Sequence, residues 1–170
     1  MAKSERILTR LWPWWIPLVL FLSLRGSDLP EPSQPLPYSH KTHVEELEIA
    51  CEDCHTNSRT SERALIPNIE TCSICHVDTE AEDPGSRAVA EYVEREQRIP
   101  WRQVHAIPDH AYFSHRRHVG LAELDCPTCH GPVREMESPF SRPFLSMDME
   151  WCVACHESRS VSNDCYNCHR

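Results

Sequence analysis

Ten cysteines, all in five C-x-x-C-H motifs, constrain this 170-residue chain more than any other feature. The pattern is the signature of covalent haem attachment, in which two thiols bond one porphyrin and the next residue offers its imidazole to the iron. Disulfides or zinc sites would not require a histidine directly after each second cysteine. We therefore predict five haem c groups with their iron. The expected attachment residues are Cys51, Cys54, Cys72, Cys75, Cys126, Cys129, Cys152, Cys155, Cys165 and Cys168, and the proximal ligands are His55, His76, His130, His156 and His169.

Five haems on so short a chain would provide most of the apolar surface that folding buries. Aromatic residues make up only 8% of the sequence, whereas there are 14 prolines. We therefore expect a mostly irregular fold, with short α-helices wrapped round five haems. The net charge of −9 argues against nucleic-acid binding, which requires clustered basic residues.

An internal repeat organises the haem motifs into modules. Residues 38–55 read YSHKTHVEELEIACEDCH and residues 113–130 read FSHRRHVGLAELDCPTCH, in register and offset by 75. The second motifs also correspond, as IETCSICH at 69–76 and MEWCVACH at 149–156. The haem domain, 38–170, thus contains dihaem modules at 38–76 and 113–156, followed by a fifth haem at 165–169.

Six histidines lie outside the motifs, and four of them form one H-x-x-H pair in each module. On a helical turn, residues i and i+3 lie near one face but diverge, so the two rings can enter two neighbouring haems. We predict His40, His43, His115 and His118 as distal ligands, with His40 and His115 serving the haems on His55 and His130. The haems served by His43 and His118 stay undetermined. For the fifth haem we favour His105, with His110 and Met149 as alternatives.

Between the modules, residues 85–98 predict a conventional linker helix. Ser86 is the expected N-cap and Pro100 ends the helix. Two pairs with i,i+4 spacing, Glu91–Arg95 and Glu94–Arg98, would support it.

The N-terminal residues 1–25 predict a membrane anchor. Basic residues precede an apolar run at 11–24, whose 14 residues would rise about 21 Å as a helix. That length suits a secretory signal better than a span of the roughly 30 Å bilayer core. However, no small-residue cleavage site follows, so we expect an uncleaved N-terminal helix. The proline-rich residues 26–37 would then be a spacer, with the haem domain on the periplasmic face of the inner membrane.

The two modules resemble the class III cytochromes, the cytochrome c3/c7 group. A closer resemblance is to the pentahaem subunit of alternative complex III. It rests on WRQVH at 101–105, PD at 108–109, FSH at 113–115, HV at 118–119, MEWC at 149–152 and CHR at 168–170. The resemblance implies a subunit of a membrane quinol:acceptor oxidoreductase. Its partners would be iron–sulfur and polytopic membrane subunits, with a periplasmic cytochrome c or an oxidase as acceptor.

These features together predict an electron-transfer subunit with no catalytic site of its own. Eleven histidines suffice for the ten axial positions of five haems, and six-coordinate haems leave no open site for a substrate. One alternative is a multihaem reductase with an open haem site, but the C-x-x-C-K motif typical of pentahaem nitrite reductases is absent. The other is a stand-alone electron shuttle, membrane-anchored, or soluble if the signal is cleaved.

Overall fold

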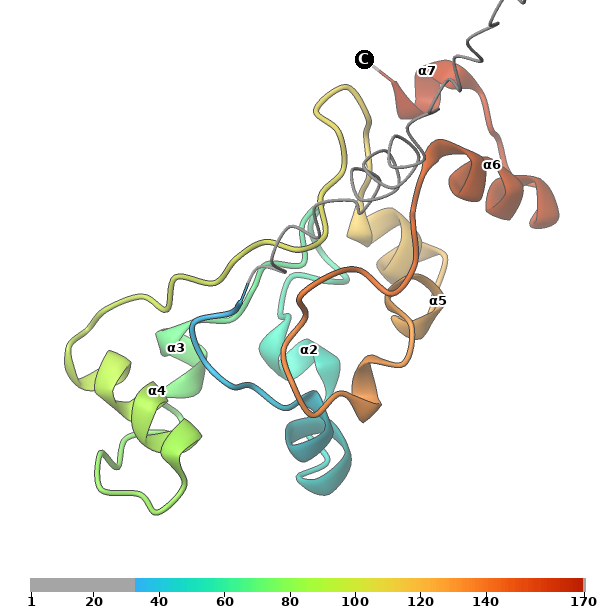
Figure 1. The fold of residues 1–170 in the computed structure, drawn as a ribbon. Helices are drawn as coiled ribbons and strands as arrows, with labels where there is room; N and C mark the ends of the chain where they lie inside the picture. Colours follow the sequence, from blue (N-terminus) through green and yellow to red (C-terminus); the bar gives the residue numbers. More distant parts are fainter. Residues whose placement is uncertain (1–32, 170) are drawn as a thin grey trace, which may run out of the picture. The chain divides into compact units, whose positions relative to one another are not determined.

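The computed structural model describes residues 33–169 (Figure 1). The predicted anchor at 1–25, and most of the proline-rich spacer, lie outside the described residues. Within residues 33–169, none of the helices combines the length and the hydrophobicity that a bilayer crossing requires.

Short helices joined by long irregular segments make up the described chain. Two π-helical turns, η1 (Lys41–Glu46) and η2 (Arg116–Leu121), occupy equivalent places in the two modules. Between residues 33 and 169 there is no β-strand, only an isolated antiparallel bridge between Ala111 and His169. The expectation of a mostly irregular fold with short helices is therefore confirmed. The other elements are α2 (Cys51–Cys54), α3 (Ile69–Cys72), α4 (Pro84–Glu94), α5 (Pro127–His130), the 3₁₀ turn η3 (Val133–Glu135), α6 (Met149–Ser158) and α7 (Cys165–Cys168).

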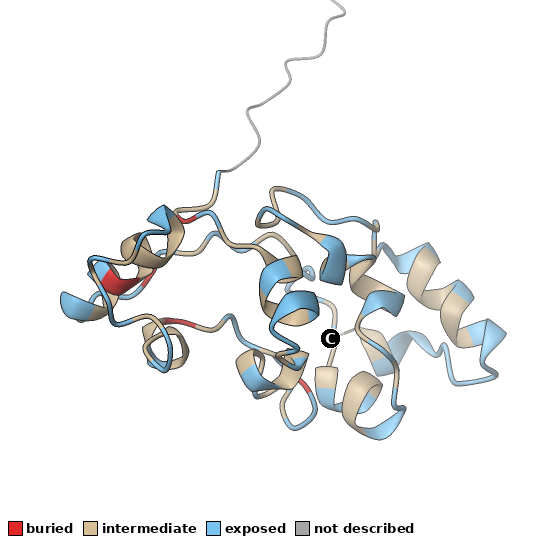
Figure 2. Cartoon of the chain, turned by 90° about the horizontal axis from the view of Figure 1, so that it is seen from below, coloured by how far each residue is buried: buried red, intermediate tan, exposed pale blue. Residues whose placement is uncertain are grey.

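The polypeptide alone has almost no hydrophobic core. Among the described residues only Leu36, Ala90 and Ile99 are buried apolar side chains, and Figure 2 shows how few positions are buried at all. Large apolar side chains are instead exposed, including Ile74 at 79% and Leu121 at 70%. Folded domains usually bury such side chains against one another. The arrangement is consistent with prosthetic groups that supply the missing apolar contacts.

Helix α4 differs from the linker helix that the sequence predicts. It begins at Pro84, so its N-cap is Asp83 and not the predicted Ser86. The Asp83 side chain accepts a hydrogen bond from the Ser86 backbone N–H at 2.6 Å. Proline suits the first helical position because its missing N–H would have no partner there. The helix ends at Glu94, and Glu96 has a φ of 51°, which an α-helix cannot continue through.

The shorter helix changes one of its two predicted ion pairs. Arg95 contacts Glu91 at 2.9 Å, as the i,i+4 spacing predicts. Arg98 lies beyond the end of the helix and contacts Glu70 at 2.9 Å instead of Glu94. The second pair therefore joins the segment after α4 to α3, whose last residue, Cys72, begins the second haem motif.

The buried side chain of Asn68 joins the same two segments, α3 and the chain after α4. Its side-chain oxygen accepts hydrogen bonds from the backbone N–H groups of Ile69, at 3.0 Å, and Ile99, at 2.8 Å, while its amide donates to the Ile99 carbonyl at 3.0 Å. The Trp101 indole adds a hydrogen bond to the Pro67 carbonyl at 3.1 Å. Buried polar groups need such partners, so these bonds hold α3 and the second haem motif against the chain that follows α4.

Candidate haem-binding site

The two H-x-x-H turns are built alike around one aromatic ring. In the first module the Tyr38 ring stacks on His43, with centroids 4.6 Å apart and planes at 25°, and meets His40 edge-on at 4.8 Å. Phe113 makes the same two contacts in the second module, stacking on His118 at 4.6 Å and 22° and meeting His115 edge-on at 4.9 Å. The aromatic residue at the start of each repeat therefore fixes the orientation of both imidazoles.

Backbone carbonyl groups hold five of the candidate histidines in one tautomer. In each, the ring Nδ1 lies 2.7–3.0 Å from a carbonyl oxygen. A carbonyl oxygen can only accept, so Nδ1 carries the hydrogen and Nε2 keeps a lone pair for a metal. Sequence reasoning did not foresee these acceptors, because backbone carbonyls leave no signal in residue identity. The pairs are His43–Ser39, His55–Leu65, His115–Glu62, His118–Ser114 and His156–Ser162.

Four motif histidines face a second histidine at a separation that would fit an iron between the rings. Two metal–nitrogen bonds of about 2.0 Å, plus about 1.1 Å from each nitrogen to its ring centre, place two axial imidazole centroids about 6.2 Å apart. The four pairs lie close to that value. They are His43–His76 at 6.1 Å, His118–His156 at 6.0 Å, His115–His130 at 6.4 Å and His110–His169 at 5.6 Å.

These pairs indicate which motif His43 and His118 face, a point that the sequence left open. His43 and His118 face the second motif of their own module, whereas His115 faces the first. His40 stands in the same place as His115 by the repeat. Burial, followed by the neighbouring His55 and His43, lowers the pKa of His40 to about 4, so this ring lies neutral beside His55. A neutral imidazole is the form that binds metals.

The structure brings His110, and not the favoured His105, to the fifth motif. The His110 ring lies nearly parallel to that of His169, with 13° between the planes. The backbone reinforces this contact, because Ala111 bridges His169 and the Tyr112 N–H donates to the Cys168 carbonyl at 2.6 Å.

His105 lies elsewhere, against the first motif of the second module. Its ring meets His130 edge-on at 4.7 Å, which leaves too little room for an iron, and meets Phe140 at 5.1 Å. Its Nε2 atom is buried without a hydrogen-bond partner among the described residues. The other alternative, Met149, begins α6 and is 64% exposed.

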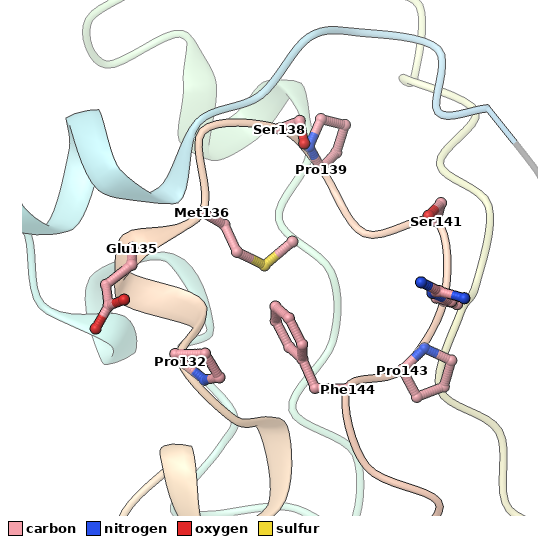
Figure 3. A pocket seen from close by; sticks show the side chains of 9 residues that line it. Pro132, Glu135, Met136, Ser138, Pro139, Ser141, Pro143 and Phe144 are labelled. Carbon is pink, nitrogen blue, oxygen red and sulfur yellow. The ribbon is translucent and has the colours of Figure 1, made fainter.

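The segment that follows the third motif, Cys126–His130, lines a hollow that the sequence did not reveal. Its volume is about 720 Å³, and the side chains of Met136 and Phe144 point toward each other inside it (Figure 3). From the same segment, Phe140 contacts the rings of His40 at 5.8 Å and Phe144 at 5.7 Å. Gly131 has a φ of 70°, and a Cβ there would lie 2.9 Å from the Phe144 Cβ, so glycine lets the segment fold back. The lining of the hollow is mixed, because Glu135, Arg142 and two serines share it with prolines and with the apolar side chains of Met136 and Phe144.

Comparison with known proteins agrees with this chemistry. Residues 111–170 match the family described as cytochrome c7 and related cytochrome c. The chain is also 28% identical, over 190 aligned residues, to the menaquinone reductase multiheme cytochrome c subunit of Nitratidesulfovibrio vulgaris strain Hildenborough. The match covers 93% of this chain and 89% of that protein. The predicted likeness to the cytochrome c7 group is confirmed for residues 111–170, and the chain is similar over most of its length to a multihaem cytochrome c subunit.

Proposed function

We propose that this multihaem c-type cytochrome carries five haems and relays electrons as a subunit of a membrane quinone oxidoreductase. The observation that carries the proposal is the pairing of histidines: four motif histidines each face a second histidine, and by the repeat His40 takes the corresponding place beside the remaining one, His55. A haem held by two histidines can change between ferric and ferrous iron but has no open position for a substrate. The proposed axial pairs are His40/His55, His43/His76, His115/His130, His118/His156 and His110/His169.

The protein's own contribution is to hold those imidazoles in fixed directions. The carbonyl partners of Nδ1 and the stacked rings of Tyr38 and Phe113 restrict ring rotation. Such outer contacts tune the electron density of a ligand and hence the reduction potential of the metal. Small differences between the two modules, such as tyrosine in one and phenylalanine in the other, would give their haems different potentials.

The histidine count argues against the reductase alternative. Five pairs use ten of the eleven histidines and leave His105, which packs on His130 instead of occupying an axial position of its own. A reductase would need one motif histidine without a partner, so that substrate could reach the iron.

Two kinds of complex are compatible with this proposal, and they differ in the direction of electron flow. The resemblance to the alternative complex III subunit favours electrons that leave quinol and pass outward to a periplasmic cytochrome c or an oxidase. The relative that matches nearly the full chain is named as part of a menaquinone reductase. That name favours electrons that arrive from outside and reduce menaquinone. In both versions the haem domain lies on the periplasmic face of the inner membrane, attached through residues 1–25.

Purification of the protein from membranes in mild detergent tests the proposal. We expect iron–sulfur and polytopic subunits to accompany it, and a pyridine haemochrome assay to give five haems per chain. The isolated complex should then be supplied with menaquinol and oxidised cytochrome c in one assay, and with menaquinone and a reduced cytochrome in the other. A high-spin signal in the resting protein would contradict the paired ligands. A haem protein that purifies alone would favour the shuttle.

A further inference from the structure

The two dihaem modules contact each other through a reciprocal pair of backbone hydrogen bonds. The N–H of Arg116 donates to the Ser61 carbonyl at 2.9 Å, and the N–H of Lys41 donates to the Met136 carbonyl, also at 2.9 Å. Residues 41 and 116 differ by 75, as do residues 61 and 136, and 75 is the offset of the sequence repeat. Each H-x-x-H turn therefore packs on the loop that follows the first haem motif of the other module. The relation is that of an internal twofold axis.

Two further contacts, made by side chains, join the two modules at this junction. Lys41 Nζ forms an ion pair with Glu137 Oε1 at 2.6 Å, and the Arg59 guanidinium donates to the Val119 carbonyl at 3.1 Å. Gly120 is required beside Arg59, because a Cβ at that position would collide with the Arg59 carbonyl oxygen. The equivalent residue of the first module is Glu45, which is exposed.

The first motifs of the two modules meet at this junction. Arg59, which donates to Val119 of the second module, also pairs with Glu52 of the first motif at 2.8 Å. Cys51 and Cys126 are equivalent residues, again 75 apart, and the pKa of Cys126 is raised by burial and next by the neighbouring Cys51. In the mature protein these sulfur atoms would be thioethers of two different haems. The first sites of the two modules are therefore neighbours across the internal twofold axis.

Within each module, and between the fourth and fifth motifs, haem motifs that are consecutive in the chain also lie next to one another in the structure. His40 and His43, three residues apart, lie beside His55 of the first motif and His76 of the second. In the second module, His115 and His118, also three residues apart, face His130 of the third motif and His156 of the fourth. Ser162 joins the fourth motif to the fifth, because its carbonyl oxygen lies 2.7 Å from His156 Nδ1 and its hydroxyl accepts a hydrogen bond from the Asn167 side-chain amide at 2.9 Å.

We propose that the five haem sites form one unbranched series. With the motifs numbered along the chain, the order is second, first, third, fourth and fifth, that is, the sites of His76, His55, His130, His156 and His169. The series crosses between modules where Cys51 meets Cys126. The order differs from the order along the chain, because the internal twofold axis places the two first sites at the centre. The ribbon agrees, since α3, α2, α5, α6 and α7 succeed one another across Figure 1. The ends of the series, where partners can exchange electrons with it, are then the second and the fifth motif. This inference rests on the proposed attachment of five haems, but not on the identity of the complex.

A zero-length cross-link tests the junction in the intact haem protein. Lys41 is the only lysine after Lys3, so a carbodiimide that joins amines to carboxylates has one target in the haem domain. We expect a Lys41–Glu137 cross-link in the peptide mass spectrum, its loss in Glu137→Gln, and its survival in the control Glu45→Gln. Coupling of Lys41 only to Glu45 or Glu46, or to no carboxylate, would overturn the junction.

Two ligand variants test the order of the sites. His110→Ala and His43→Ala would each leave one iron five-coordinate and high-spin, at the fifth and at the second site. A high-spin iron strongly perturbs the NMR signals of its nearest haem, so we expect His110→Ala to alter the methyl signals of the haem on Cys152 and Cys155 first. His43→Ala should first alter those of the haem on Cys51 and Cys54.

The possible failures can be told apart. A haemochrome assay that gives fewer than five haems per chain in the parent protein would contradict the proposed function itself. If the protein carries five haems but either ligand variant first perturbs a haem other than the expected one, only the order is overturned. Perturbation of the haem at the second site in His110→Ala would be such a result.

Discussion

Replacing His110 by alanine is the sharpest test of the fifth haem site. The imidazole lies 5.6 Å from that of His169 and is inclined by 13°, while the neighbouring contacts, the bridge from Ala111 and the bond from Tyr112, use only main-chain atoms. Alanine therefore removes the ligand and keeps the backbone that positions it. Since one of five irons loses its sixth ligand, we expect about one fifth of the low-spin signal to become high-spin and about one carbon monoxide to bind per reduced chain.

His105→Ala is the matched control for that experiment. This change deletes a ring packed on His130 and Phe140 but leaves all five proposed pairs intact. We expect it to lower the stability of the protein without creating a carbon monoxide site. Optical titration with carbon monoxide and EPR of the oxidised protein measure both variants. Stoichiometric binding to His105→Ala, with none to His110→Ala, would refute the assignment of His110.

Three further substitutions have defined outcomes. Asn68→Ala should lower the free energy of unfolding in guanidinium by about 2–4 kcal/mol, because it leaves buried backbone groups unpaired; the exposed Asn167→Ala should change it by less than about 0.5 kcal/mol. Phe113→Leu should retain five haems but shift EPR g-values, since the stack that orients His118 is lost, and an unaltered spectrum would count against that role. Met149→Leu should leave the optical and EPR spectra unchanged, whereas the loss of one low-spin signal would identify Met149 as a ligand.

Much of the candidate site was predictable because its chemistry is local in sequence. The C-x-x-C-H spacing is set by the size of a porphyrin and by the reach of the two cysteine side chains and the histidine side chain. The motifs can therefore be recognised from the sequence without knowledge of the fold. The repeat in register likewise singled out His40, His43, His115 and His118. The sparse core was predictable from composition, since only three apolar residues are buried in the part of the chain that the structure describes.

Contacts between distant segments were not predictable in the same way. His105 and His110 both lie in one irregular stretch, and only the bridge between Ala111 and His169 decides which ring reaches the fifth motif. The N-cap of α4 was not predictable either, because residue preferences do not rank the two candidates. Both Asp83 and Ser86 are good N-caps, and the hydrogen bond from the Ser86 N–H selects Asp83.

The sequence by itself determined which groups can bind haem, because thioether formation and iron ligation require particular atoms at particular spacings. The tertiary structure alone decided how the sites neighbour one another. The bonds from Lys41 to Met136 and from Arg116 to Ser61 join residues 95 and 55 positions apart, through backbone atoms that every residue possesses. Such bonds leave no trace in residue identity, so the internal twofold axis, and with it the order of the sites, emerges only when the chain is folded.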